Sequence, residues 1–301
     1  MDLFGRFLYM LGLVALGFGA RSLGVLTEAR NDRLSQLAFY VLLPALIFTS
    51  TYDERLGAIL SVELAAATVA TIGVALALSW TANHDGSDEV RSVALVQSYH
   101  GNLGFFGLPV VATTLGGDAV ATATVILGIA ALVQVPLTVS VLVRINDASA
   151  SLAGELRSLV TNPVLLTLAA ALVFAALGLS LPGAVDAGLE RLSTFALPTA
   201  LLAVGGSLDA VTRDVSLTHT GRVVGIKTVA MPLVAWTVFS TLGVDALTRQ
   251  AGVVMFGAPT AVATYVYAAE LGGDEQFASV NVFATTVASI LSLFVLLQLV
   301  T

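Results

Sequence analysis

Two long apolar segments, about half a chain apart, are each interrupted by glycine and proline. The first interruption reads Gly-Asn-Leu-Gly-Phe-Phe-Gly-Leu-Pro over residues 101–109, and the second reads Gly-Ala-Pro-Thr-Ala over residues 257–261. Each is followed by the tetrad Leu-Gly-Gly-Asp, at residues 115–118 and 271–274, so the two copies lie 156 residues apart. Such paired interruptions in two apolar halves are typical of transporters built from inverted repeats, in which the binding site lies where the helices break.

The composition places the chain in a membrane. Hydrophobic residues make up 57% of it and charged residues 11%, whereas soluble domains carry about 25% charged residues. Apolar stretches recur at lengths of about 17–25 residues, which as helices span about 30 Å of hydrocarbon. Their unbroken Ala, Leu and Val runs argue against the short alternating strands of a β-barrel. Because there is no cysteine, disulfides and cysteine metal sites are excluded, and no metal site is predicted.

The apolar pattern predicts an all-α integral membrane protein with ten transmembrane helices. The polar stretches between them, such as Ile145 to Arg157, are too short to hold a soluble domain. Five spans in each half is an odd number, so the halves are expected to have opposite orientation: residues 1–145 form the first inverted repeat and residues 158–301 the second. The predicted spans are 3–22, 33–52, 57–80, 90–113, 119–143, 160–180, 187–208, 219–243, 247–270 and 275–299.

A second correspondence supports the repeat. Leu43-Pro44 in the second span matches Leu197-Pro198 in the seventh, 154 residues later. Both prolines are expected in the middle of a span, where neighbouring helices can satisfy the carbonyl that proline leaves free.

The distribution of basic residues predicts the orientation. Short cytoplasmic loops carry an excess of Lys and Arg. With the N-terminus outside, the inside loops hold eight arginines and the outside segments four, so both termini are predicted outside. The inside set is Arg21, Arg30, Arg33, Arg91, Arg144, Arg157, Arg213 and Arg222, and the outside set is Arg6, Arg55, Arg191 and Arg249.

Five segments, in order along the whole chain, resemble the auxin efflux carrier family, which includes plant auxin carriers and bacterial malonate carriers. Each motif is weak alone, and the ordered set is more specific. The matching segments are Tyr-Val-Leu-Leu-Pro-Ala-Leu-Ile-Phe (40–48), the interruption at 101–109, Pro-Thr-Ala-Leu-Leu-Ala-Val-Gly (198–205), residues 227–232, and Ala-Pro-Thr-Ala-Val (258–262).

The resemblance implies a fold similar to that of bile-acid/sodium symporters, with two inverted five-helix repeats. It implies a scaffold from helices 1, 2, 6 and 7 and a mobile transport unit from helices 3–5 and 8–10. The broken helices 4 and 9 are expected to cross near the middle of the membrane. Relatives form homodimers in the cell membrane and move organic anions. This chain lacks the long central loop of the large plant carriers, so it resembles a compact prokaryotic member. No nucleic acid partner is expected.

The interruptions are the predicted binding site. The N-terminal end of a half-helix carries partial positive charge and free N–H groups, which suit a carboxylate. Pro109 and Pro259 are expected to enforce the breaks, and Asn102 offers both a donor and an acceptor. The alternative is close helix packing through small residues. The predicted crossover residues are Gly101, Asn102, Gly104, Gly107, Pro109, Gly257, Ala258, Pro259, Thr260 and Thr264.

Polar and ionisable residues inside the spans add candidates for support or ion coupling: Glu63, His100, Gln134 and Lys227. Ionisable groups within a membrane are costly and therefore suggest function. Lys227 is the only lysine, and it is predicted to pair with an acidic or carbonyl group of the transport unit, with Glu63 as the candidate partner in a support region beneath the crossover. Glu63 could instead bind a coupling proton or lie at the outer interface, and Lys227 could extend its amine to the interface. His100 could titrate or serve packing, and Gln134 could line the site.

The leading functional prediction is a secondary active carrier of a small organic anion that works by an elevator-like movement. One alternative is a sodium-coupled symporter of the bile-acid type, with Asn102 near the ion, and another is a membrane sensor that binds without translocating. An enzyme is not predicted, because the chain has no Gly-x-Ser-x-Gly and no Asp in mid-span. No Walker A motif occurs. No cofactor is expected beyond a coupling H+ or Na+.

Overall fold

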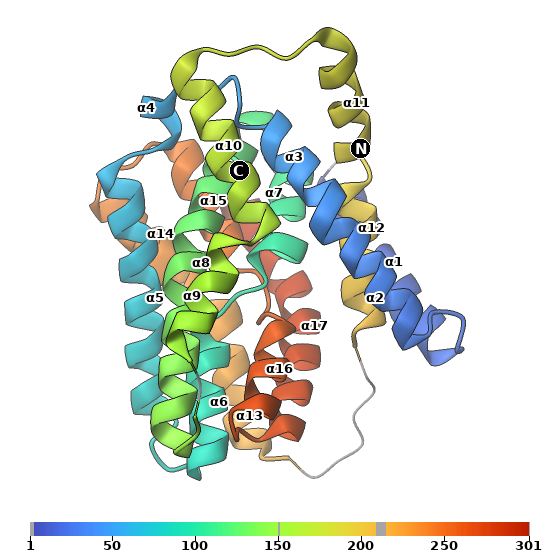
Figure 1. The fold of residues 1–301 in the computed structure, drawn as a ribbon. Coiled ribbons are helices and arrows are strands. Elements are labelled where there is room, and N and C mark those ends of the chain that lie inside the picture. Colours follow the sequence, from blue (N-terminus) through green and yellow to red (C-terminus); the bar gives the residue numbers. More distant parts are fainter. Residues whose placement is uncertain (1–2, 150, 209–214, 301) are drawn as a thin grey trace.

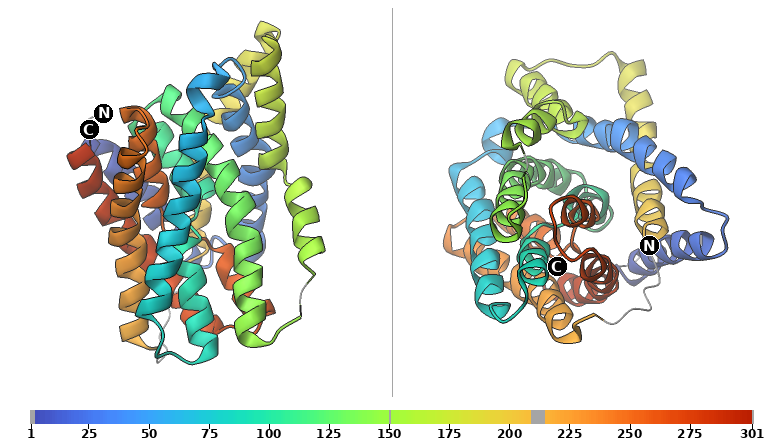
Figure 2. Two further views of the ribbon diagram at one scale, coloured as in Figure 1. Left: turned by 90° about the vertical axis from the view of Figure 1, so that its left-hand side faces the viewer. Right: turned by 60° about the horizontal axis from the view of Figure 1, so that its bottom comes forward.

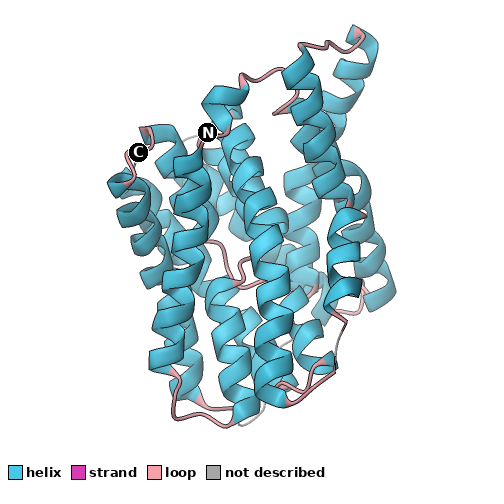
Figure 3. Ribbon diagram, turned by 60° about the vertical axis from the view of Figure 1, so that its left-hand side comes forward, coloured by secondary structure: helices cyan, strands magenta, loops and turns pink. Residues whose placement is uncertain are grey.

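The computed structural model of this protein describes residues 3–149, 151–208 and 215–300. These residues form helices joined by turns, and they contain no named β-strand (Figures 1 and 3). Arg213, one of the arginines used to predict the orientation, lies outside the described residues.

The helices of the first half are α1 (Leu3–Ser22), α2 (Glu28–Leu37), η1 (Ala38–Leu42), α3 (Leu43–Thr49), α4 (Leu56–Ile59), α5 (Val62–Ala82), α6 (Asp88–Tyr99), η2 (Leu103–Gly107), α7 (Leu108–Thr114) and α8 (Gly117–Asn146). Those of the second half are α9 (Leu152–Val160), α10 (Pro163–Leu177), α11 (Gly183–Ser193), α12 (Ala196–Gly206), α13 (Leu217–Gly225), η3 (Ile226–Ala230), α14 (Met231–Thr241), α15 (Ala246–Phe256), α16 (Ala263–Glu270) and α17 (Glu275–Val300). The η elements are single π-helical turns.

The helices pack in two groups (Figures 1 and 2). In one group, α1 runs along α12, α2 contacts α12, and α3 contacts α10 and α11. In the other, α5, α6 and α8 pack on one another, while α14 and α15 pack together and α17 contacts α13 and α16. Phe4 and Phe7 of α1 contact the ring of Phe294 in α17 edge-on, with centroids 6.0 and 5.3 Å apart. The two ends of the chain thus lie at the same end of the molecule.

Four described helices are long and apolar enough to cross a membrane, or five if the bent pair α9–α10 is one span. The prediction of ten spans is not confirmed by this measure. The fourth and ninth predicted spans are interrupted, between α6 and η2 and between α15 and α16, and the second begins with the charged helix α2. A helix that ends in mid-span does not have the length of a continuous one.

Each π-helical turn of the described chain is followed by a proline. Pro44, Pro109 and Pro232 each stand two residues after such a turn, near the start of the next helix. Proline has no N–H and clashes with the carbonyl four residues before it, and a π-turn widens the helix at that point. The residue before each proline donates to the carbonyl five residues back: Leu43 to Ala38, Leu108 to Leu103, and Met231 to Ile226.

The two matching prolines have different surroundings. Pro44 lies inside the continuous run of helix from Glu28 to Thr49, just after the π-turn η1, whereas Pro198 lies in the first turn of α12, just after the break between α11 and α12. The first turn is where proline costs least, because its missing N–H has no intrahelical partner there.

The repeated Leu-Gly-Gly-Asp tetrads form turns between a half-helix and the long helix that follows. Gly116 precedes α8 with φ = 95°, and Gly272 precedes α17 with φ = 72°. Only glycine adopts such angles without strain. In the second tetrad the Asp274 carboxylate accepts the backbone N–H of Phe277 at 2.9 Å and so caps α17.

The segment from Ile145 to Arg157, expected as a loop, contains most of an additional helix. Helix α9 starts at Leu152 and meets α10 at a bend of 51°. Ser151 caps its N-terminus by accepting the N–H of Gly154 at 3.2 Å. A short amphipathic helix beside a span is compatible with the polar composition that suggested a loop.

Candidate functional site

The two interrupted helices meet in the interior of the molecule, where Figure 3 shows loop backbone between the helices. Gly101 and Thr260 form an antiparallel bridge. The N–H of Asn102 donates to the carbonyl of Pro259 at 2.8 Å, and the N–H of Ala261 donates to the carbonyl of His100 at 2.9 Å. Backbone that leaves a helix inside a membrane must find other partners, and here each break supplies them to the other.

Two half-helices begin at this crossing. The first runs from Leu103 to Thr114, and Asn102 caps it by accepting the N–H of Phe105 at 3.3 Å. The N–H groups of Leu103 and Gly104 donate no hydrogen bond within the described part of the chain. The start of this half-helix therefore has two free donors and the positive end of the helix dipole.

Two other helices end at the crossing, and a polar side chain caps the last carbonyl of each. Gln134 of α8 donates to the carbonyl of Tyr99, the last residue of α6, at 3.0 Å. The Lys227 amine donates to the carbonyl of Phe256, the last residue of α15, at 3.3 Å. Both residues were predicted site candidates, and both satisfy carbonyls that the broken helices leave free.

A cavity of about 160 Å³ opens beside the first half-helix. Its polar lining includes His100, Asn102, Gln134 and Asn162, and none of its lining residues is a lysine or an arginine. Gly101 and Gly104 also line it. A Cβ at Gly104 would meet no atom within 4 Å, whereas one at Gly101 would lie 3.0 Å from the Lys227 Nζ. The cavity thus combines free N–H groups with an amine directly behind its glycine wall.

His100 connects the crossing to α8. Its Nδ1 lies 2.8 Å from the hydroxyl of Thr138, which also lies 3.2 Å from the Tyr99 hydroxyl. Its carbonyl accepts from the hydroxyl of Thr260 at 3.2 Å in addition to the N–H of Ala261. His100 therefore lines the cavity and also holds the two breaks together.

Some predicted crossover residues lie elsewhere. Pro109 does not form the break, which falls at residues 100–102, because the π-turn η2 allows the helix to continue through it. Thr264 does not line the cavity, and its hydroxyl accepts from Gln97 at 3.1 Å in a buried polar network. Gly107 and Gly257 allow close packing, since a Cβ there would lie 3.0 Å from Met255 Sδ and 2.6 Å from Leu293 Cδ2. Pro259 and Ala258 do lie in the second break.

The predicted pair of Glu63 and Lys227 is wrong. Glu63 is exposed in the first turn of α5, whereas Lys227 is fully buried in the π-turn η3. The amine contacts the Phe256 carbonyl and lies 3.0 Å from Met231 Sδ, and it forms no ion pair with any described residue. Its counter-charge is the partial negative charge at the end of α15.

Sequence reasoning missed one wall of the cavity. Phe39 and Leu43 come from the second predicted span, and Asn162, Val164 and Leu165 come from the start of α10. Only Asn162 is polar, and its side chain caps α10 by accepting the N–H of Val164 at 2.9 Å. The Asn-Pro sequence at 162–163 is a signal for a helix start, but it does not indicate which cavity the helix faces.

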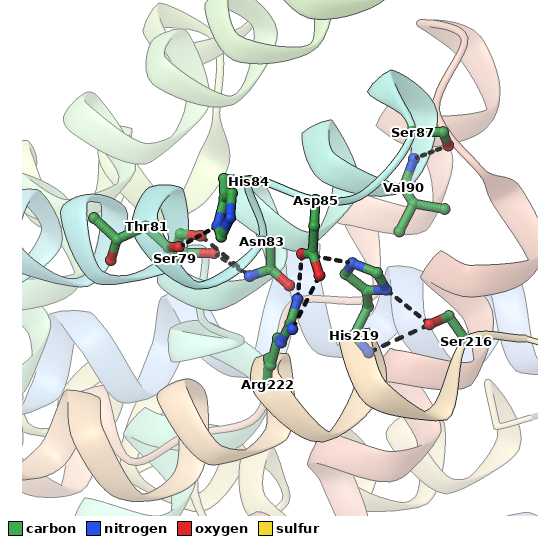
Figure 4. A network of polar contacts seen from close by, with 10 residues as sticks. All are labelled: Ser79, Thr81, Asn83, His84, Asp85, Ser87, Val90, Ser216, His219 and Arg222. Carbon is green, nitrogen blue, oxygen red and sulfur yellow. Dashed lines mark hydrogen bonds and ion pairs between the residues drawn. The ribbon is translucent and has the colours of Figure 1, made fainter.

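A second polar cluster joins the turn after α5 to the start of α13 (Figure 4). Arg222 binds both carboxylate oxygens of Asp85, and its Nη2 atom lies 3.1 Å from Asp85 Oδ2. His219 Nε2 lies 3.3 Å from Asp85, and its Nδ1 lies 2.7 Å from the Ser216 hydroxyl. The hydrogen bond from Arg222 holds the pKa of the Asp85 carboxyl well below its usual range. The cluster is partly exposed and ties two helix ends together.

Replacing Asp85 by Asn is expected to lower the melting temperature at pH 7 by a few degrees at most, because exposed ion pairs contribute little. A carboxyl whose pKa is lowered in the folded state stabilises the fold above its unfolded pKa of about 3.9, and this stabilisation is lost as the pH falls through the folded pKa. The difference between the wild type and Asp85→Asn should therefore shrink in acid. Thermal melts of Asp85→Asn, Arg222→Gln and the double variant test this, and additive effects would contradict it.

Two interrupted helices that cross inside a bundle of apolar helices are typical of a class of membrane transporter. The chain belongs to the membrane transport protein family, whose model matches residues 3–153 and 149–297. The resemblance to auxin efflux carriers is thereby confirmed, and the protein is a multi-pass membrane protein. It is 27% identical over 290 residues to a protein described as an uncharacterized transporter from Methanothermobacter thermautotrophicus (strain Delta H). The alignment covers 95% of this chain and 94% of the relative.

Proposed function

We propose that this protein is a secondary active carrier of a small carboxylate, which binds at the helix crossing. One observation carries the proposal: Leu103 and Gly104, whose N–H groups have no partner in the described part of the chain, line a cavity whose wall at Gly101 lies next to the Lys227 amine. Free N–H groups at a helix start favour an anion. Transport does not require catalysis. The contact of Ser216, His219 and Asp85 is unsuited to a catalytic role, because Arg222 neutralises the Asp85 carboxylate.

The proposal includes ten spans in two inverted repeats, residues 1–145 and 158–301. A further correspondence supports it. The only two tryptophans, Trp80 and Trp236, stand 156 residues apart, the same offset as the Leu-Gly-Gly-Asp tetrads. Arg91 lies over the Trp80 ring at 4.2 Å, and Arg249 lies over the Trp236 ring at 4.7 Å. Trp–Arg pairs at membrane interfaces are expected at opposite faces in an inverted repeat.

We further propose that the first group of helices is a scaffold and the second an elevator-like transport unit. The crossing cavity lies between them, with α3 and α10 on one side and η2 and α8 on the other. A polar hollow of about 450 Å³ lies by Val262 and Tyr265, next to the ends of α1 and α12. Figure 1 shows α7 and α16 on opposite sides of the crossing. Each half-helix start thus faces its own hollow, as expected for access from two sides.

A specific observation favours this carrier over the sodium-coupled symporter. Carbonyls at a helix C-terminus beside a crossing are the ligands that a coupling sodium ion needs. Here the Lys227 amine binds the carbonyl of Phe256, and the Asn102 side-chain oxygen accepts from Phe105. The protein supplies its own donor where a sodium ion would need oxygen ligands. We also propose that transport is coupled to a proton, with His100 as a candidate group. The protein is proposed to be a homodimer in the cell membrane with both termini outside.

Replacing Asn102 by Asp distinguishes a carboxylate carrier from a sodium-coupled symporter. Asp can cap the helix as Asn does, and the added negative charge in a cavity without a lysine or arginine should abolish carboxylate binding. Thermal melts verify that the variant folds, because the new charge is buried. Asn102→Ala should weaken binding by about 1–3 kcal/mol, the cost of an unsatisfied buried partner. Calorimetric titration against a panel of carboxylates measures the affinity of both variants. Asn83→Ala, at the far end of α5, is the control.

The outcomes decide between the alternatives. Unchanged carboxylate affinity in Asn102→Asp would reject the anion site, and sodium-dependent binding enhanced by the same change would favour the symporter. Flux in proteoliposomes distinguishes a carrier from a sensor, since a sensor binds the carboxylate without moving it.

A further inference from the structure

A groove with an entirely apolar lining lies between α8, α9 and α10. Its volume is about 510 Å³, and every lining residue is leucine, isoleucine, valine, alanine or glycine. The bend of 51° between α9 and α10 forms one edge of it. Leu132 and Leu166 line it with 59% and 53% of their surfaces exposed. In a multi-pass membrane protein such side chains face hydrocarbon, so the groove opens toward lipid.

The groove and the crossing cavity have one lining residue in common. Leu165, in the first turn of α10, lines both. On α8, Leu127 and Ala131 line the cavity, while the neighbouring Gly128 and Leu132 line the groove. Next to this point the two helices are in close contact, because a Cβ at Gly128 would lie 2.5 Å from Leu168 Cδ2. We call the point between α8 and α10 at which the groove and the cavity share Leu165 the window.

We propose that this groove is a lateral entrance through which a carboxylic acid with one acidic group and an apolar remainder passes from the bilayer into the crossing cavity. The inference rests on the proposed function and specifies its substrate class. The carboxylate reaches the N–H groups of Leu103 and Gly104, and the apolar remainder stays against the walls of the cavity. Because no lysine or arginine lines the cavity, a second anionic group would be buried there without a counter-charge.

The absence of cysteine from the sequence makes each introduced cysteine a unique probe. Ala131→Cys places a thiol on the cavity side of Leu165. In liposomes, a maleimide with an apolar tail that dissolves in the bilayer should label this thiol. Adding Leu165→Trp should slow the labelling at least tenfold by filling the window. Val173→Trp, on the exposed side of α10 and outside the lining of both the groove and the cavity, should change the rate less than twofold.

Equal labelling rates with and without Leu165→Trp would overturn the entrance, as would faster labelling by a charged, membrane-impermeant maleimide than by the apolar one. Melting temperatures of the tryptophan variants verify folding. In the Ala131→Cys background, octanoate should protect the thiol and succinate should not, and Asn102→Asp should remove the protection. Protection by succinate alone would overturn the substrate class. Normal window labelling without any carboxylate binding or flux would instead reject the proposed carrier function.

Discussion

Replacing Lys227 by Met is expected to reduce transport at least tenfold without lowering the melting temperature. The Lys227 side chain is fully buried and forms no ion pair among the described residues. Burying an amine without a counter-charge is costly, and methionine has similar length without that cost. Loss of the donor to the Phe256 carbonyl costs about 1–3 kcal/mol, so the two effects offset each other. The cavity behind Gly101 loses its nearby amine, and anion binding should weaken.

Proteoliposome flux and thermal melts measure the two effects separately. Met231→Leu is the matched control, because it removes the contact of Met231 Sδ with the amine and leaves the amine in place. It should transport at a rate within twofold of the wild type. If Lys227→Met transports normally, the amine serves only to cap α15. If it melts far below the wild type, the amine is needed for the fold rather than for the anion.

Replacing Gly205 by Ala is expected to destabilise the protein by about 3 kcal/mol or more, at the upper end of overpacking effects. A Cβ at Gly205 would lie 2.1 Å from the carbonyl oxygen of Val14, and one at Gly17 would lie 2.2 Å from that of Leu202. In both cases the obstacle is backbone, which cannot rotate away. Helices α1 and α12 would have to separate along their whole contact.

The matched controls are two other glycines of helix α1. A Cβ added at Gly12 or at Gly19 would meet no atom within 4 Å, so Gly12→Ala and Gly19→Ala should be neutral or stabilising by up to about 1 kcal/mol. Thermal melts of the purified protein compare these two controls with Gly205→Ala and Gly17→Ala. A melting temperature of Gly205→Ala equal to that of the controls would show that α1 and α12 can move apart freely.

The sequence was sufficient to locate the two breaks, because they depend on local chemistry. Glycine and proline in apolar segments change the backbone whatever surrounds them, and the breaks lie at residues 100–102 and 257–262. The repeated tetrads were informative for the same reason, since Gly116 and Gly272 both need a positive φ. Pro109 was misinterpreted because a π-turn, which cannot be foreseen from residue type, lets a helix continue across a proline.

The partners of the buried polar groups could not be predicted, because they depend on packing between distant segments. Lys227 was identified as unusual from its isolation in the sequence, but its true partner is the carbonyl of Phe256, and backbone groups have no sequence signature. Glu63 was chosen because it is an acidic residue inside a predicted span, although it lies in an exposed first turn. The apolar cavity wall from Phe39 and Leu165 resembles any other membrane-spanning surface, so nothing in the sequence distinguished it.

The backbone bridge at the crossing limits how the interior can deform. Separating the two breaks would leave the N–H groups of Asn102 and Ala261 and the carbonyls of His100 and Pro259 without partners, and each such group costs several kcal/mol away from water. The two broken helices are therefore held together as one rigid body, and internal shear between them is prohibited during any proposed movement. In the proposed elevator movement, a ligand held at the crossing would keep the same contacts with both broken helices throughout the cycle. Its affinities on the two sides of the membrane would then differ only through the walls assigned to the proposed scaffold, those from α3 and α10.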